Sequence, residues 1–92
     1  MNKCFLIANI VKNEGFKFII KKKSKHKSAV TLQIKLRNGS IFKAIGYDEV
    51  ADYILRQNIK TGFIAIIGKL RQNEKTKRDY YIKIEYIKKL QL

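Results

Sequence analysis

An alternating segment followed by a tight-turn signal limits this chain to folds that contain antiparallel strands. Apolar and polar side chains alternate over residues 30–37, the period-two pattern of a strand with one buried and one solvated face. Asn38-Gly39 comes next and favours a hairpin, because both residues tolerate a positive φ. Residues 41–45 read as the return strand, which Gly46 ends. The middle of the chain is therefore predicted to be a β-hairpin.

Three further extended segments flank this hairpin. Residues 3–11 form an apolar run that predicts a buried strand, and extended character resumes over 16–20 after a bend or bulge at Gly15. Residues 63–67 predict a fourth strand, and the alternation over 82–90 predicts a fifth. The chain is thus predicted to contain five strands, the first of them long and bent.

One short helix is predicted between the third and fourth strands, over residues 49–58. Its apolar positions fall on one helical face: Val50, Ala51, Ile54 and Leu55. Asp48 precedes it, where a carboxylate can accept N–H groups of the first turn. Three strands, a helix and two strands within 92 residues is the OB-fold order. We therefore expect residues 1–92 to form one all-β domain, a five-stranded OB-fold barrel with one short helix between strands 3 and 4.

The charge of the chain indicates a polyanionic partner. Lys and Arg total 21 against 7 Asp and Glu, giving a net charge of +14. Such a domain attracts nucleic acid, acidic lipid or an acidic protein face. Lys, Ile and Asn are abundant, so an AT-rich genome explains part of the Lys excess, but it does not explain the scarcity of acidic residues. No apolar run approaches the roughly 18 residues of a membrane span.

The basic residues gather where OB-folds bind their ligands, across strands two and three and against the loops joining strands one–two and four–five. In the first loop the predicted nucleic-acid-binding residues are Lys21, Lys22, Lys23, Lys25 and Lys27. On or beside the strands between they are Lys35, Arg37 and Lys43. In and beside the second loop they are Arg71, Lys75, Lys77, Arg78 and Tyr80. Loops are rich in Lys in most proteins, so the coincidence is only moderately specific.

Aromatic platforms are fewer than a single-strand binder needs. Stacking contributes about 1–3 kcal/mol per base in such proteins, and this chain has no Trp. Tyr47, Tyr80 and Tyr81 are the best candidates for exposed rings, with Phe42 behind them. Core or barrel-rim packing is the favoured interpretation for each ring. Binding is therefore expected to be mainly electrostatic.

Nothing in the sequence indicates catalysis, a cofactor or a metal. Cys4 is the only cysteine, so no internal disulfide can form and a reducing intracellular compartment is expected. His26 is the only histidine and has no second ligand nearby, which argues against a metal site. No Ser-His-Asp set, glycine-rich phosphate loop or paired-carboxylate motif is present. We expect a non-enzymatic protein without catalytic residues.

The fourth strand has apolar residues in both phases, so both of its faces require cover. Phe63, Ala65 and Ile67 face opposite to Ile64 and Ile66. A barrel interior buries only one of these faces. At least one of Phe63, Ala65 and Ile67 is therefore expected to be covered by the helix or by another chain, as in a homo-oligomer or a partner interface.

Short motifs along nearly the whole chain resemble the bacterial single-stranded DNA-binding proteins (SSB). They are residues 2–10, Ala29-Val30, Ile45-Gly46 with Ala51, Tyr53 and Ile54, and Lys60-Thr61 with Gly68-Lys69-Leu70, where Thr61 replaces the usual glycine. The size is similar to PriB, the primosomal relative of SSB. The composition resembles small SSB-like plastid proteins, the hypothetical chloroplast reading frame forty-one family. This resemblance implies an OB fold, single-stranded DNA or RNA as partner, and a plastid or the bacterial cytoplasm as compartment.

The chain departs from the SSB pattern in three ways. The stacking Trp positions have no aromatic residue, the long loop between strands two and three is reduced to Asn38-Gly39, and no acidic tail precedes Leu92. Two functions therefore remain open. One is binding of single-stranded nucleic acid without sequence preference. The other is a non-enzymatic structural or adaptor subunit, whose basic face meets an acidic protein or ribosomal RNA in a larger assembly.

Overall fold

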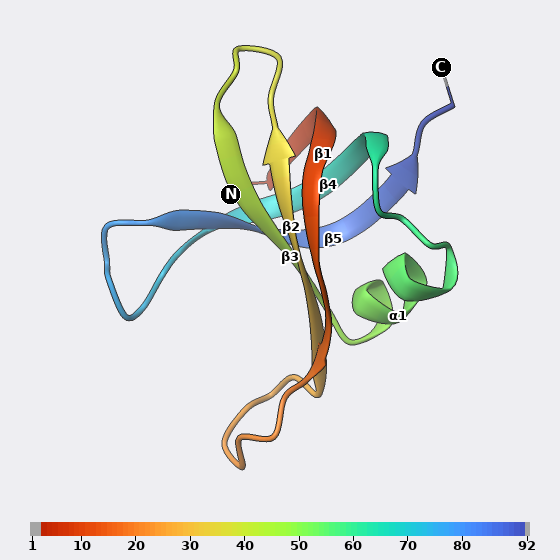
Figure 1. Cartoon of the computed structure of the whole chain (residues 1–92). Coiled ribbons are helices and arrows are strands. Elements are labelled where there is room, and N and C mark those ends of the chain that lie inside the picture. Colours follow the sequence, from red (N-terminus) through yellow and green to blue (C-terminus); the bar gives the residue numbers. More distant parts are fainter. Residues whose placement is uncertain (1–2, 92) are drawn as a thin grey trace.

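The computed structural model describes residues 3–91, and its elements follow the predicted order (Figure 1). They are β1 (Lys3–Phe18), β2 (Ser28–Lys35), β3 (Ile41–Tyr47), α1 (Glu49–Arg56), β4 (Gly62–Gln72) and β5 (Tyr80–Lys89). The strands close into a barrel in the order β1-β2-β3-β5-β4. Neighbouring strands are antiparallel, except that β3 and β5 pair in parallel. The predicted five-stranded barrel with one short helix between the third and fourth strands is confirmed.

Strand β1 is long because it belongs to both halves of the barrel. Residues 3–10 pair with β4, and residues 9–18 pair with β2. Two register shifts bend the strand on the β2 side, one between Ile10 and Lys12 and one between Asn13 and Phe16. Gly15 lies in the second shift with a φ of 100°, which glycine adopts without steric cost. The bend predicted at Gly15 is therefore a bulge within one continuous strand.

The core is built from the inward-facing residues of every strand and from the helix. Its seven largest fully buried side chains are Val30, Leu32, Ile34, Ile54, Ile59, Ile64 and Ile66. The alternation in β2 and β4 places Val30, Leu32, Ile34, Ile64 and Ile66 inside because successive residues of a strand face opposite sides, whereas Ile54 comes from α1 and Ile59 from the segment that follows it. Helix α1 buries Ala51 and Ile54 and packs against β2, β3 and β5. Within residues 3–91, no helix is long and apolar enough to cross a membrane.

The β2–β3 connection is a tight turn of a different type from the one expected. The N–H of Leu36 donates to the carbonyl of Ser40 at 2.8 Å, and the N–H of Gly39 donates to the carbonyl of Leu36 at 2.9 Å. Only Gly39 has a positive φ (89°), whereas the side chain of Asn38 accepts the N–H of Ser40. The connection is therefore a three-residue turn with glycine in the left-handed position.

Gly46 does not end β3, which continues to Tyr47. A Cβ at Gly46 would lie 2.7 Å from Cγ1 of Val50, closer than real Cβ atoms approach a neighbour. The glycine therefore serves the packing of α1 against β3 rather than the end of the strand. Helix α1 is also two residues shorter than the predicted 49–58, a difference common at helix ends.

Candidate nucleic-acid interface

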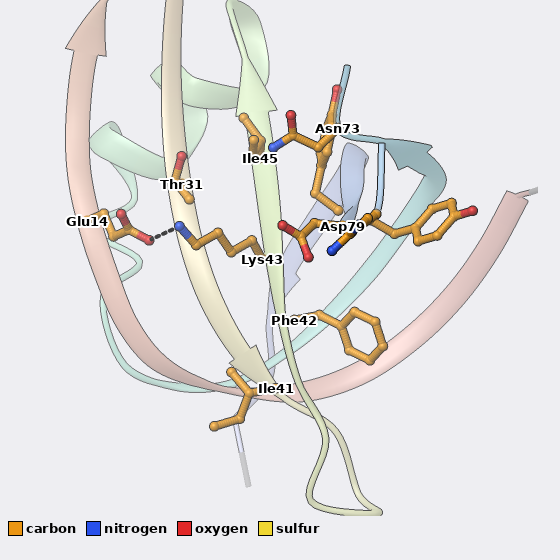
Figure 2. Close-up of a pocket in the computed structure, with 11 residues that line it drawn as sticks. Glu14, Thr31, Ile41, Phe42, Lys43, Ile45, Asn73 and Asp79 are labelled. Carbon is orange, nitrogen blue, oxygen red and sulfur yellow. Dashed lines mark ion pairs between the residues drawn. The ribbon is translucent and has the colours of Figure 1, made fainter. Parts of the chain in front are cut away.

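Two adjoining hollows form a groove on the outer surface of β3 and the beginning of β5. One has a volume of about 650 Å³ and is drawn in Figure 2, and the other has a volume of about 860 Å³. They share Ile45, Asn73 and Tyr81, so they are parts of one continuous depression. Figure 2 shows Asn73 and Asp79, from the β4–β5 loop, beside Ile45 and Lys43 of β3. Volumes of this size are typical of ligand sites.

Cations outnumber carboxylates in the lining of this groove. The cations are Lys25, Lys43, Arg71, Lys75, Arg78 and Lys83, and the carboxylates are Glu14, Glu74 and Asp79. Glu14 is partly neutralised, since its Oε2 lies 3.8 Å from Nζ of Lys43 and accepts a hydrogen bond from the Gln33 amide at 3.4 Å. The groove therefore presents a positive potential to a polyanion.

Aromatic rings from three segments meet at one wall of the groove. The imidazole of His26, in the β1–β2 loop, stacks on the ring of Tyr47 in β3, with centroids 4.1 Å apart and planes 16° from parallel. Burial, together with a hydrogen bond to Tyr81 of β5, raises the pKa of Tyr47 to about 12. Tyr47 is thus packed at the barrel rim, as the sequence favoured. The stacking partner His26 was not predicted.

Asp48 holds the basic β1–β2 loop against the barrel. Its Oδ2 lies 2.8 Å from Nδ1 of His26, and its Oδ1 accepts the backbone N–H of Lys27 at 2.7 Å and of Ser28 at 3.3 Å. The hydrogen bond from Lys27, followed by that with His26, lowers the pKa of Asp48 below its usual value. One carboxylate therefore connects the start of α1 to a loop twenty residues earlier in the chain.

The predicted role of Asp48 as a helix cap is wrong in its chemistry. Asp48 occupies the N-cap position, but its side chain makes no hydrogen bond to the helix. Its φ of 52° lies in the left-handed region, whereas a capping residue normally has extended backbone angles. That conformation accompanies a carboxylate that bonds to the loop instead of to the first turn of α1.

The structure gathers some of the predicted binding residues and separates others. The groove is lined by Lys25, Lys43, Arg71, Lys75, Arg78 and Tyr80. Exposed on the two loops but outside the lining are Lys21, Lys22, Lys23, Lys27 and Lys77. Lys35 and Arg37 line a different hollow of about 400 Å³, together with Ile7 and Phe63. Those two residues lie outside the groove.

Sequence reasoning left out several groove residues that a stricter use of strand alternation identifies. Lys83 lies between the buried Ile82 and Ile84 of β5, so it must face outward, and it lines the groove. Tyr81 lies two residues before Lys83 in β5, so its side chain faces the same side of the strand. Asn73 had no such signal, because it lies in a loop whose path depends on contacts across the barrel.

The outer surface of β4 joins that of β1 to form an apolar face. In the register, Phe63 pairs with Asn9, Ala65 with Ile7, and Ile67 with Phe5. Phe63 is 43% exposed, and Ala65 and Ile67 are half-buried. The residues Phe5, Ile7, Phe63, Ala65 and Ile67 are called here the β1/β4 apolar face. Helix α1 packs against β2, β3 and β5. Cover of this face by another chain, the second alternative of the prediction, stays a prediction.

The raised pKa of Tyr47 predicts a loss of stability in alkaline solution. An unfolded tyrosine ionises near pH 10, whereas Tyr47 in the folded protein ionises at about pH 12. Between these values the unfolded state releases a proton that the folded state retains, so the free energy of unfolding falls as pH rises. Denaturant titrations across this range should show a smaller fall for Tyr47→Phe. Lysine ionisation is common to both proteins and cancels in the comparison. Equal falls would contradict the prediction.

The closed strand order and the single helix before β4 define an OB-fold barrel, with its groove on the surface this fold uses for ligands. By sequence, the chain matches no protein-family model and no curated protein.

Solved structures are similar to it over almost its full length. The SSB domain of a Synechococcus sp. protein has a TM-score of 0.73 and 16% sequence identity, covering 95% of this chain and 93% of that one. PriB from Ralstonia solanacearum has a TM-score of 0.71 and 14% identity, covering 98% and 99%. The fold is therefore an SSB/PriB-like OB fold.

Proposed function

We propose that this protein binds single-stranded nucleic acid, without sequence preference, in the groove between its two basic loops. The observation that carries the proposal is the position of the groove, which is rich in cations and lies between two loops that carry five further exposed lysines: Lys21, Lys22, Lys23, Lys27 and Lys77. The similarity to the SSB domain and to PriB supports it at the level of the fold. The role is one of binding only, with no catalytic residue, cofactor or metal.

In this proposal the contacts divide between phosphates and bases. Lys43, Arg71 and Lys83 face the groove and are suited to the sugar-phosphate backbone, whose contacts fix the position of a strand but do not read its sequence. Tyr80 is half exposed and lines the groove, so it is the ring proposed to contact a base. Tyr47 is held by its neighbours and acts as support. The compartment proposed is a plastid or the bacterial cytoplasm.

The β1/β4 apolar face favours a second role, as a docking subunit of a larger assembly or homo-oligomer. Phe5 is 64% exposed and Ile7 is 55% exposed, and they lie directly beside Ile67 and Ala65. A contiguous apolar surface of this kind marks an interaction site in soluble proteins. This role is compatible with nucleic-acid binding because the two surfaces use different residues.

A titration with fluorescent oligonucleotides tests the proposed function. Fluorescence anisotropy with single-stranded DNA and RNA of mixed sequence, at two salt concentrations, should show binding that weakens strongly at the higher salt. Oligonucleotides of different sequence should bind with similar affinity, and a duplex of equal length serves as the control. Absence of single-strand binding at low salt would overturn the proposal and leave the docking role.

A further inference from the structure

Two largely exposed apolar side chains lie where β1 meets the β1–β2 loop, although the ring of the first, Phe18, packs edge to face against that of Phe16 with centroids 5.1 Å apart. Phe18, at the end of β1, is 77% exposed, and Ile20, which follows it at the next position of the same phase, is 91% exposed. Lysines flank both, at Lys17 and Lys21. Figure 1 shows this loop projecting beyond the barrel. Phe18 and Ile20 together are called here the apolar tip. Large apolar side chains this exposed, inside a basic segment, require an explanation other than folding of the monomer.

A small apolar pocket lies on another part of the molecule, between α1 and β5. Its volume is about 180 Å³, and its lining includes Val50 and Tyr53 of α1 and Ile87 of β5. Small-molecule sites usually measure about 300–1,000 Å³, so this α1/β5 pocket is suited to a protruding side chain rather than to a metabolite. Glu49 and Glu85 also line it.

The pocket has acidic side chains at its edge. Glu49 and Asp52, both in the first turn of α1, form no ion pair among residues 3–91. Glu85 is shared by Lys3 at 3.4 Å and Lys69 at 3.7 Å. Glu49 therefore lines the apolar pocket without a cation, and Asp52 lies three residues further along α1, an arrangement complementary to an apolar group with basic neighbours.

We propose that the apolar tip of one copy inserts into the α1/β5 pocket of a second copy, with Lys17 or Lys21 meeting Glu49 or Asp52. The tip is a protruding apolar group with basic neighbours, and the pocket is a small apolar hollow with acidic side chains at its edge. Neither residue of the tip lines the pocket of its own chain, so the tip is available to a second copy. In this proposal the contact is heterologous, because each copy places its tip in one neighbour and receives the tip of another. Copies joined in this way add head to tail rather than closing into a pair. The proposal does not depend on nucleic-acid binding.

Sedimentation velocity over a range of protein concentrations, without nucleic acid and at low salt, tests this contact. The average mass of the particles should keep rising with protein concentration, past the mass of any dimer or other closed oligomer that forms through the β1/β4 apolar face. At a fixed protein concentration, the average mass should fall when added salt screens the ion pairs. Ile20→Ser removes the tip and Glu49→Lys reverses the pocket charge. Each variant should weaken the concentration-dependent association tenfold or more. Val11→Ser, at another exposed apolar position, should associate like the original protein.

Mixing the two variants distinguishes this contact from others. Ile20→Ser retains a working pocket and Glu49→Lys retains a working tip, so an equimolar mixture should recover association that neither variant shows alone. Thermal melts establish that both variants are folded. The proposal is overturned if the average mass of the original protein does not depend on concentration, if the variants associate as the original protein does, or if the mixture recovers nothing.

Discussion

Replacing Lys21, Lys22, Lys23 and Lys25 with Gln is expected to weaken single-strand binding and to flatten its salt dependence. Each neutralised phosphate contributes about −0.7 to the slope of log affinity against log salt, so four lost contacts remove at most about 2.8 from that slope. The loss should be similar for all sequences, since phosphate contacts carry no base information. These lysines are exposed, so the free energy of unfolding should change little. Anisotropy titrations at several salt concentrations measure both effects.

A control variant with the same net charge distinguishes the effect of the β1–β2 loop lysines from the effect of lowering the net charge of the protein. Lys12, Lys60, Lys88 and Lys89 are exposed and line neither part of the groove, and their replacement by Gln removes the same formal charge. This variant should retain most of the affinity and most of the salt slope. If the two quadruple variants weaken binding equally, the attraction comes from the overall field of the protein, and the proposed role of the β1–β2 loop is wrong.

Gly68→Ala is expected to cause the largest loss of stability of any glycine-to-alanine change in the barrel, about 1–3 kcal/mol, because Gly68 is buried. A Cβ at Gly68 would overlap the backbone carbonyl oxygen of Lys83 and lie 2.9 Å from Cγ2 of Ile82. Neither can move away easily, because β4 and β5 are paired at this point and their register shifts between Ile67 and Gly68. Urea denaturation followed by circular dichroism measures the loss.

Gly46→Ala provides the matched comparison for this glycine. Its added methyl group would meet side-chain atoms of Val50 and Ile54, which can adjust, rather than backbone. A smaller loss of stability is therefore expected than at Gly68. A change at Gly68 of less than about 0.5 kcal/mol, the range of ordinary surface substitutions, would show that the β4–β5 pairing is more adaptable than its register indicates.

The strand order could be predicted from the sequence because it depends on local periodicity. The alternation of Val30, Leu32 and Ile34 with polar residues specifies both a strand and its buried face, and the structure buries all three. The backbone conformation of the turns was harder to predict from the sequence. Asn38-Gly39 indicated a turn, but whether one or both residues adopt a positive φ depends on the hydrogen bonds between Leu36 and Ser40.

The candidate site was predictable in its charge and less so in its geometry. The lysines of the β1–β2 loop were evident from composition, and the groove lies between the expected loops. Alternation gives the face of a residue but not its position around a twisted barrel, so it did not show that Lys35 lines another hollow. The contacts of His26 with Tyr47 and Asp48 join residues about twenty positions apart, and no local pattern encodes such pairs.

In the proposed complex, the three-residue turn between β2 and β3 limits how far the protein can enclose a strand. A turn that ends at Gly39 has no arm that could fold back over the groove, so in the proposed complex only the β1–β2 and β4–β5 loops flank the bound strand. Release then requires no unwrapping of a β2–β3 arm, and a second protein can reach the bases that the two loops leave uncovered. The proposed complex is therefore suited to transient binding and transfer of a strand rather than to a long-lived complex.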